Sequence, residues 1–288
     1  MHFVEVKGIL SSQNVMNIYR GCSHGCIYCD SRSTCYNMMH AFEDIEVKIN
    51  SPELLEKSLR SKRKKCMIAT GSMCDPYIPL ENELELTRRC LEIIDQYHFG
   101  VSLLTKSDLI LRDTDLLDSI NKNEKVVVQM TLTTFDDDLC RIIEPGVCVT
   151  SSRYNVLSVM RKRNIPTIVW LTPFLPYIND TEENITGLLN YCADAGVKGV
   201  IFFGIGLTLR EGNREYFYSA LDKFFPGLSK RYCKEFGMSY EIHSPNEAKL
   251  LKIINEFCDK YGIMHEYNEC FAYLSALPDK YEQLSFFE

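Results

Sequence analysis

The sequence has no run of eighteen consecutive apolar residues, so no segment has the length and hydrophobicity of a membrane-spanning helix. Its first ten residues also lack the pattern of a secretory signal peptide, because Glu5 and Lys7 interrupt the apolar residues there. Together the two absences predict a cytoplasmic protein without a membrane partner.

An excess of positive charge is missing as well. The 32 Lys and Arg residues against 39 Asp and Glu residues give a formal net charge of −7. Proteins held on DNA mainly by bulk electrostatics carry charge of the opposite sign, so the composition disfavours that class.

No linker rich in proline, glycine or serine divides the 288 residues, a length that suits a single α/β barrel. Hydrophobic residues make up 45% of the chain, which is enough for a large core. The 13 cysteines are an odd and high number for a chain without a secretion pattern. Free thiols in a reducing compartment, together with a thiolate-bound metal centre, fit this number better than disulfide bonds do.

Short apolar runs alternate with amphipathic segments, which predicts an α/β fold with a parallel sheet. Ser51 is predicted to cap a helix that begins at Pro52, and Thr181 and Gly196 are predicted to cap the two ends of another. Six such repeats predict a partial (β/α)6 barrel of the TIM type over residues 1–210, with reactive groups at the C-terminal ends of the strands. The predicted strands are Val15–Tyr19, Cys66–Thr70, Gly100–Thr105, Lys125–Thr131, Thr167–Thr172 and Gly199–Gly204.

The pattern becomes mostly helical after Leu209. Helices are predicted over Asn213–Phe225, Leu228–Phe236 and Pro245–Tyr261, the last preceded by Ser244 as a start signal. Residues 211–288 are therefore predicted to form a mostly helical C-terminal extension. Because no flexible linker precedes it, we expect the extension to pack on the barrel.

A cluster of cysteines follows the first predicted strand with the spacing C-x3-C-x2-C: Cys22, Cys26 and Cys29. The neighbouring Gly21 and Gly25 would let the backbone approach a compact inorganic centre. No fourth cysteine follows at a matching short spacing, so a [4Fe–4S] cluster held here keeps one iron without a protein ligand. The alternative is a structural zinc site with His24 or Cys35 as the fourth ligand.

At these residues the sequence resembles the radical S-adenosylmethionine (SAM) superfamily, whose hallmark is C-x3-C-x-aromatic-C, with Tyr28 as the aromatic residue. The resemblance covers most of residues 14–210 and points to the branch that includes spore photoproduct lyase. It implies that the amino and carboxylate groups of SAM chelate the open iron. One electron from the reduced cluster then cleaves SAM, and the resulting 5′-deoxyadenosyl radical abstracts a hydrogen atom from the substrate. A low-potential electron donor of the flavodoxin or ferredoxin type is implied as a partner.

The loop after the second predicted strand resembles the family loop that contacts the methionine end of SAM. Gly71 would let the backbone approach the ligand, Ser72 is predicted to bind the cofactor beside it, and Asp75 would accept a hydrogen bond from the α-ammonium group. An ordinary Asp-Pro turn at Asp75 is the alternative. Cys74, in the same loop, is a candidate hydrogen-atom donor to a product radical. The corresponding thiol of spore photoproduct lyase aligns nearer to Ser72, and a buried free cysteine is the simpler interpretation.

Polar residues also follow the later strands. The resemblance implies that Lys106 pairs with the SAM carboxylate, whereas a solvated surface lysine is the alternative. Thr131 and Thr133 share one face of their strand, where their hydroxyls would bond to ribose or carboxylate, although threonine is also a good strand former. Arg153 matches a recurrent arginine of the branch and is expected to pair with the SAM carboxylate. Thr172–Pro176 resembles the apolar segment that flanks adenine.

The substrate is open between two classes. A DNA lesion or a nucleotide is favoured by two basic stretches, Lys57–Lys65 and Arg161–Arg163, although such stretches are usually solvated faces. A peptide or a small metabolite is the second class. A non-catalytic iron–sulfur protein is a third interpretation, and the release of 5′-deoxyadenosine distinguishes it from both enzymes.

The last residues resemble the short peptide by which bacterial repair and replication proteins dock on the DNA sliding clamp. Its anchors would be Gln283, Leu284, Phe286 and Phe287. The alternative is that these apolar side chains pack on the protein's own barrel. A sliding clamp and nucleic acid are thus candidate partners.

Overall fold

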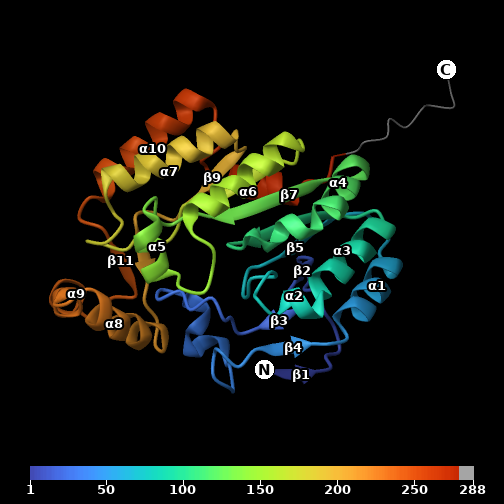
Figure 1. Ribbon diagram of the computed structural model, residues 1–288, viewed down its shortest axis with the longest axis horizontal. Coiled ribbons are helices and arrows are strands. Elements are labelled where there is room, and N and C mark those ends of the chain that lie inside the picture. Colours follow the sequence, from blue (N-terminus) through green and yellow to red (C-terminus); the bar gives the residue numbers. More distant parts are fainter. Residues whose placement is uncertain (279–288) are drawn as a thin grey trace.

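A six-stranded parallel sheet forms the centre of the computed structural model, which describes residues 1–278 (Figure 1). Its strands are β2 (Val15–Met16), β5 (Met67–Thr70), β6 (Gly100–Thr105), β7 (Val126–Thr131), β8 (Thr167–Trp170) and β9 (Gly199–Ile201), and they lie side by side in this order. Each strand therefore pairs with the preceding one, as in a barrel built from successive strand–helix units. The predicted partial (β/α)6 barrel is confirmed.

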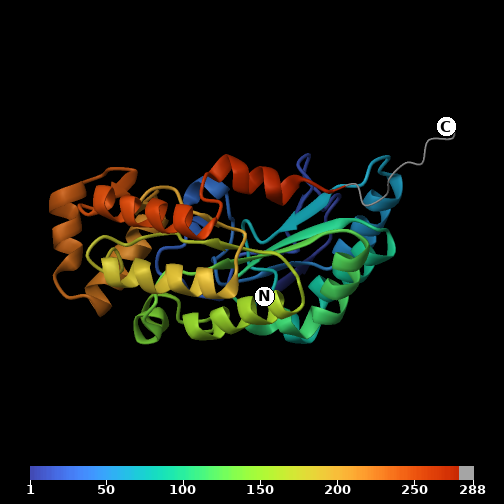
Figure 2. The same ribbon diagram turned by 90° about the horizontal axis from the view of Figure 1, so that it is seen from above.

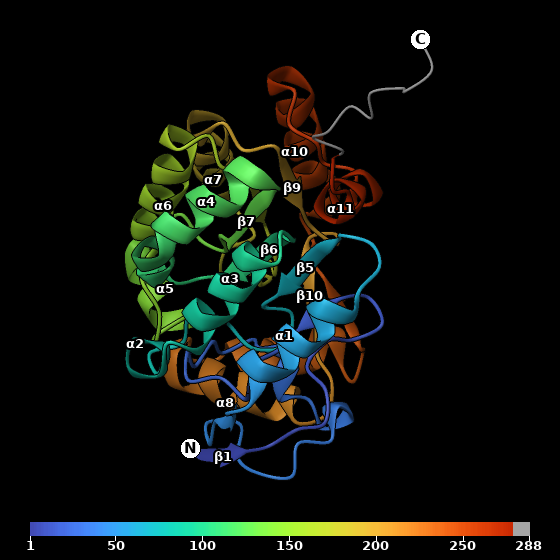
Figure 3. The same ribbon diagram turned by 90° about the vertical axis from the view of Figure 1, so that its right-hand side faces the viewer.

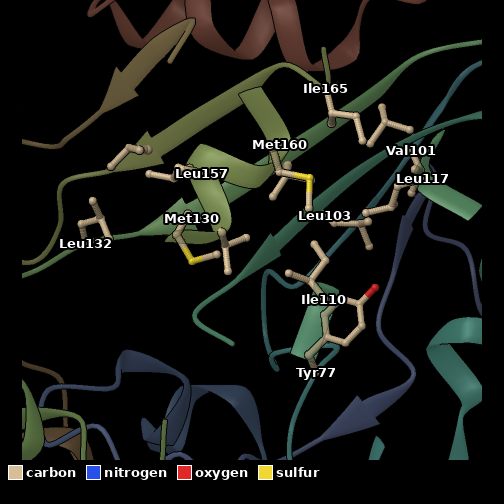
Figure 4. Close-up of a cluster of buried hydrophobic side chains, with 14 of the residues drawn as sticks. Tyr77, Val101, Leu103, Ile110, Leu117, Met130, Leu132, Leu157, Met160 and Ile165 are labelled. Atoms are coloured by element: carbon tan, nitrogen blue, oxygen red, sulfur yellow. The ribbon is translucent and has the colours of Figure 1, made fainter. Parts of the chain in front are cut away.

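Helices cover the outer face of this sheet (Figures 1 and 3). They are α1 (Ser51–Ser61), α2 (Glu81–Leu84), α3 (Leu86–Gln96), α4 (Thr114–Asn123), α5 (Asp137–Ile143), α6 (Thr150–Lys162) and α7 (Glu182–Ala195). Figure 4 shows Met130 and Leu132 near Leu157 and Met160 of α6, and all four side chains are fully buried. This apolar layer between sheet and helices keeps the strands in register.

The inner face of the sheet is closed at one end by α11 (Tyr267–Ser275), which lies on the side opposite α4 and α6 (Figure 2). The apolar layer between them consists of Met67, Val127, Ile168, Ile201, Cys270 and Leu274. Further along the strands the interior becomes polar, because Gln129 donates to Ser102 Oγ (2.7 Å) and accepts from Trp170 Nε1 (2.8 Å). The strands thus lead from an apolar end, filled by α11, to a polar end that remains open to a ligand.

Local signals predicted one of the two helix starts correctly. Thr181 caps α7 by accepting from the backbone N–H of Asn184, and Gly196 ends the helix in the left-handed conformation, as expected. Ser51, by contrast, is the first helical residue of α1, and its hydroxyl donates to the carbonyl of Lys48. The predicted cap at Ser51 is therefore wrong by one position.

Two small sheets were not predicted. β1 (His2–Val4), β4 (Glu46–Lys48) and β3 (Tyr19–Arg20) form one, and β10 (Gly206–Thr208) pairs with β11 (Glu241–His243) in the other. The predicted strand Val15–Tyr19 is consequently divided, since β2 joins the central sheet and β3 joins the first small sheet.

The C-terminal part contains the predicted helices. They are α8 (Asn213–Phe224), α9 (Leu228–Phe236) and α10 (Glu247–Tyr261), and α10 packs against α7. Helix α10 begins two residues later than predicted because Ser244 Oγ accepts from Asn246 N in the turn before it. The β10–β11 pair joins residues on both sides of the predicted boundary at residue 210, and that boundary stays a prediction. Among residues 1–278, no helix is long and apolar enough to span a membrane.

Candidate functional site

A cavity of about 470 Å³ opens at the C-terminal ends of the parallel strands. Of the residues predicted for the site, ten line it: Cys22, Cys26, Tyr28, Cys29, Gly71, Ser72, Cys74, Asp75, Lys106 and Thr131. Thr172 and Pro173 of the segment predicted to flank adenine also line it, and their role there stays a prediction. Thr133 and Arg153 do not.

The cysteine loop is held by backbone hydrogen bonds from two sides. Cys22 N donates to Phe42 O (3.1 Å), and Ile27 N donates to Ile143 O (3.0 Å). Gly21 adopts φ +85°, and a Cβ there would lie 2.5 Å from Phe42 O. The glycine is therefore required by the close approach of this backbone rather than by the expected approach to a metal centre.

The three cysteines suit a polynuclear centre better than one zinc ion. All three line the same cavity, and Cys22 and Cys26 are buried. Four thiolates around one zinc ion at about 2.3 Å lie about 3.8 Å apart. Within the described part of the chain, the three sulfurs belong to no group of ligand atoms that all lie within 4.8 Å of one another. This wider spacing disfavours the zinc alternative.

The pKa values of the three thiols are shifted in different directions. The Cys74 thiol, hydrogen-bonded to Cys22, and His24 hold the pKa of Cys22 well below its usual value despite burial. Burial raises the pKa of Cys26 and Cys29. A bound metal centre would supply the positive charge that keeps such buried thiols deprotonated.

Lys106, at the end of β6, brings a cation to this loop. Its Nζ lies 5.8 Å from the centre of the Tyr28 ring. Burial opposes its charge, but attraction to Cys26 in its thiolate form and to Glu144 outweighs this effect and raises the pKa of Lys106. The side chain therefore remains a cation on the cavity wall, where an anionic group of a ligand can reach it.

The Asp75 carboxylate accepts several hydrogen bonds from other groups of the chain. It accepts from Thr105 Oγ1 (2.7 Å), Lys106 N (2.7 Å) and Tyr77 N (2.9 Å). The buried ring of His24 lies 3.6 Å away, and although burial opposes protonation, the charge of Asp75 raises the pKa of His24. The residue thus ties the β5 loop to β6 while it lines the cavity, and its predicted hydrogen bond to the α-ammonium group of SAM stays a prediction.

Arg153 requires a correction. Its side chain is fully buried, and its Nη1 lies 2.6 Å from Glu144 Oε2. The same guanidinium donates to Cys148 O (2.9 Å) and Thr131 O (3.1 Å). All of these partners belong to the chain, so Arg153 acts behind the cavity wall and the expected pairing with the SAM carboxylate does not fit.

Glu144 is the residue that sequence reasoning missed. It accepts from the Tyr28 hydroxyl as well as from Arg153, and it is fully buried. Burial opposes its charge, but Arg153 and Lys106 outweigh that effect and hold the pKa of Glu144 below its usual value. The carboxylate therefore connects the cysteine loop to the end of β7, and no local pattern around it signals this role.

The two threonines are separated by the end of the strand. Thr131, the last residue of β7, lines the cavity. Thr133 lies beyond the strand, is fully buried, and its carbonyl accepts from Asn179 and Asn184. Its predicted role at the ligand is wrong because strand alternation does not continue past residue 131.

The β5 loop packs tightly against its neighbours. Gly71 adopts φ +96°, and a Cβ there would lie 2.0 Å from Leu104 O. Ser72 is exposed, with its hydroxyl 3.5 Å from Asn17 Oδ1. Cys74 is buried beside Cys22, and this hydrogen bond and burial raise its pKa well above the usual thiol value. The candidate hydrogen donor is thus protonated and adjacent to Cys22, one of the three predicted cluster ligands.

The mouth of the cavity contains residues that were not predicted. Trp170 at the end of β8 lies 5.9 Å from Phe203, centre to centre, and Phe203 is 57% exposed. Glu241 and His243 of β11 complete the rim. The sole tryptophan of the chain at a strand end was a usable signal, whereas the β10–β11 pairing has no local signature.

The basic stretches lie elsewhere. Lys62–Lys65 leads into the start of β5, whereas the cavity lies at the opposite end of that strand. Arg161–Arg163 likewise precedes β8, and its end arginines contact Asp194 O and Asp118. None of these basic residues lines the cavity. The clamp-like residues Gln283, Leu284, Phe286 and Phe287 lie outside the described residues.

Part of this chain is similar in sequence to known proteins. An uncharacterized protein of Mycobacterium tuberculosis, Rv2578c, is 31% identical over 223 residues, which cover 75% of this chain and 65% of that protein. This chain thus spans about two thirds of that relative's length.

The fold is similar to two solved structures of spore photoproduct lyase variants. One has a TM-score of 0.65 at 15% identity and covers 90% of this chain and 78% of that chain. The other, with bound AdoMet and dinucleoside spore photoproduct, has a TM-score of 0.61 at 14% identity. It covers 86% of this chain and 74% of that chain. The sequence model of the radical SAM superfamily matches residues 16–189. The chain therefore belongs to the radical SAM superfamily, whose members use a [4Fe–4S] cluster and SAM.

Proposed function

We propose that the chain is an enzyme in which Cys22, Cys26 and Cys29 hold the [4Fe–4S] cluster and the adjoining cavity holds SAM. The observation that supports this most directly is that all three cysteines line one cavity at the strand ends. The volume of this cavity, about 470 Å³, lies within the range of small-molecule sites. When bound, the reduced cluster and SAM supply a 5′-deoxyadenosyl radical for hydrogen-atom abstraction. As a member of this superfamily the protein needs a reductant, which we propose to be a flavodoxin or ferredoxin.

The chain's own residues bind and orient the ligand in this proposal. Lys106 supplies a cation for the SAM carboxylate, and the Thr131 hydroxyl faces the same cavity. Tyr28 and Glu144 fix the cysteine loop from behind. Cys74 is positioned to return a hydrogen atom to a product radical, because its thiol is protonated and lines the cavity.

For the substrate we favour a nucleoside or nucleotide over a peptide. Trp170 and the exposed Phe203 place two aromatic rings at the mouth of the cavity, where they can stack on a planar base. The basic stretches at the other end of the barrel do not reach this mouth, so they do not supply its contacts to a phosphate. A lesion in DNA would then be recognised mainly through its bases.

Anaerobic reconstitution tests whether the three cysteines hold a cluster that cleaves SAM. The protein should bind one [4Fe–4S] cluster, and after reduction it should convert SAM to methionine and 5′-deoxyadenosine. Replacing Cys22, Cys26 and Cys29 by alanine should abolish both, whereas Cys35→Ala, an exposed cysteine of the same segment, should preserve them. A cluster retained in the triple variant would contradict the assignment, and a bound cluster without SAM cleavage would leave the non-catalytic interpretation.

Deuterium transfer tests the substrate class. Deuterated thymidine dinucleotides and deuterated peptides are incubated separately with reduced protein and SAM. Deuterium should enter 5′-deoxyadenosine from the nucleotide, and Phe203→Ala should reduce this transfer without changing SAM cleavage in the absence of substrate. Transfer from peptides alone would favour the second class.

A further inference from the structure

A second group of ligand-type side chains lies at the edge where β1 pairs with β4, and it is not part of the cavity. One nitrogen or oxygen atom each of His2, His40 and Asp44 lies within 4.8 Å of the other two. Within residues 1–278, it is the only group of three or more His, Cys, Asp or Glu side chains that meets this distance.

The small sheet brings these residues together from distant positions. His2 on β1 is the register partner of Glu46 on β4, so their side chains lie on the same side of the sheet. Asp44 comes two residues before Glu46, and His40 lies in the loop that leads to them. The fold thus directs two imidazoles and two carboxylates toward one place.

The ring of His40 has the orientation of a metal ligand. Its Nδ1 lies 3.0 Å from Ala41 O, so Nδ1 carries a hydrogen, and in the neutral ring the lone pair is then on Nε2. Nε2 is buried without a hydrogen-bond partner and lies 3.7 Å from Glu46 Oε2. A lone pair that faces a carboxylate is unfavourable unless a proton or a metal ion lies between them. Metal-binding histidines commonly donate their other ring hydrogen to a backbone carbonyl in this way.

Asp44 is ready to serve as a ligand. Its Oδ1 contacts the Met1 amino group (2.9 Å), and its Oδ2 lies 3.1 Å from His2 Nδ1. A carboxylate in such a position is an ordinary ligand for ions of the zinc class. A metal ion between His2 and Asp44 would replace the proton that they now share.

We propose that His2, His40 and Asp44 bind one divalent ion of the zinc class, with Glu46 or water as the fourth ligand. Two imidazoles and a carboxylate form a donor set that zinc prefers, whereas calcium and magnesium prefer oxygen ligands alone. The site is separate from the cluster and does not depend on the proposed function.

The ion would stabilise the support of the cysteine loop. Phe42 lies between His40 and Asp44, and its carbonyl accepts from Cys22 N (3.1 Å). A site that fixes residues 40–46 therefore also fixes the backbone on which Gly21 and Cys22 rest. Loss of the ion should lower the stability of this region without removing any cluster ligand.

The test uses the full chain with Cys22, Cys26 and Cys29 replaced by alanine, which removes the cluster thiolates. Cobalt(II) and zinc(II) are titrated separately, and cobalt reports its ligands through its absorption spectrum. We expect one ion per chain, a cobalt spectrum without thiolate charge-transfer bands, and a higher melting temperature with zinc. His40→Ala and Asp44→Asn should each weaken binding by more than the roughly 10–100-fold cost of losing an outer-sphere partner.

His265→Ala is the matched control. His265 has the same local arrangement, with Nδ1 3.2 Å from Ile263 O and Nε2 3.8 Å from Asp259, but it belongs to no group of three. This variant should bind zinc as the parent does. If His40→Ala loses the parent's circular dichroism, His2→Gln on the edge strand repeats the measurement. No uptake by the parent, a thiolate spectrum, or equal binding by folded ligand variants and control would overturn the proposal.

Discussion

Glu144 and Arg153 form an ion pair, 2.6 Å between Oε2 and Nη1, in which neither side chain is exposed to solvent. The pair lies behind the cysteine loop, because Glu144 also accepts from the Tyr28 hydroxyl and Arg153 donates to Thr131 O. It therefore links the first loop of the barrel to the end of β7. Glu144 and Arg153 are thereby placed to influence the cavity although neither of them lines it.

The first prediction concerns this pair. Glu144→Gln should destabilise the protein by about 3–5 kcal/mol, because it leaves the Arg153 guanidinium buried without a counter-charge. Denaturant unfolding of the cluster-free protein measures this loss. Arg141→Ala, which removes an ion pair to Asp138 on the exposed side of α5, should have little effect. Equal stability of the two variants would contradict the network.

The second prediction concerns the role of Lys106 in SAM binding. Lys106→Met should weaken SAM binding by about 1.5–3 kcal/mol, roughly tenfold to a hundredfold, through loss of one charge-assisted hydrogen bond. The cluster should remain intact, and the exposed Lys57→Met should bind SAM normally. Equilibrium dialysis against the reconstituted protein gives the dissociation constants. Unchanged affinity in Lys106→Met would show that the carboxylate of SAM lies elsewhere.

Periodicity and spacing predicted the six strands and the cysteine loop because these features are local. Alternation could not show that β2 and β3 join different sheets, since that depends on the distant β4. Glu144 was missed because its partners Tyr28 and Arg153 are 116 and nine residues away in the chain, and only the fold brings the three together.

The candidate site was also predictable only in part, because contacts between distant residues decide it. The residue types at the strand ends were predicted, but the sequence could not show which of them the chain itself would occupy. Arg153 was expected to bind SAM, whereas its guanidinium is buried in an ion pair with Glu144. The Asp75 carboxylate lines the cavity but already accepts from Thr105 and Lys106 N. A side chain's free bonding capacity is set by its three-dimensional neighbours.

The third prediction tests the close approach at Gly71. Gly71→Ala places a Cβ 2.0 Å from Leu104 O and requires a left-handed backbone, so it should cost more than about 1–3 kcal/mol of stability. It should also weaken SAM binding, because the β5 loop must move. Gly8→Ala is the control, since a Cβ there meets nothing within 4 Å. Thermal unfolding with and without SAM distinguishes the two variants.

The fourth prediction concerns Cys74. Cys74→Ala should retain the cluster and SAM cleavage, because the thiol contacts Cys22 without being one of the three ligands. If its thiol returns a hydrogen atom to the product, deuterium from heavy water should enter the product of the parent and not that of the variant. Cys148→Ala, outside the cavity lining, is the control. Deuterium incorporation that survives in Cys74→Ala would assign the donor to another group.

The last prediction addresses the clamp-like residues, which lie beyond the described part of the chain. Leu284, Phe286 and Phe287 are expected to anchor in a preformed apolar pocket of a bacterial sliding clamp, after Gln283. The net charge of −7 gives this protein no overall electrostatic attraction to DNA. Docking on the clamp would bring it to DNA by another route. Calorimetric titration of clamp with the full chain should show binding that a variant ending at Glu282 lacks. A full chain that does not bind, or two proteins that bind equally, would leave the terminal aromatics to pack on the protein itself.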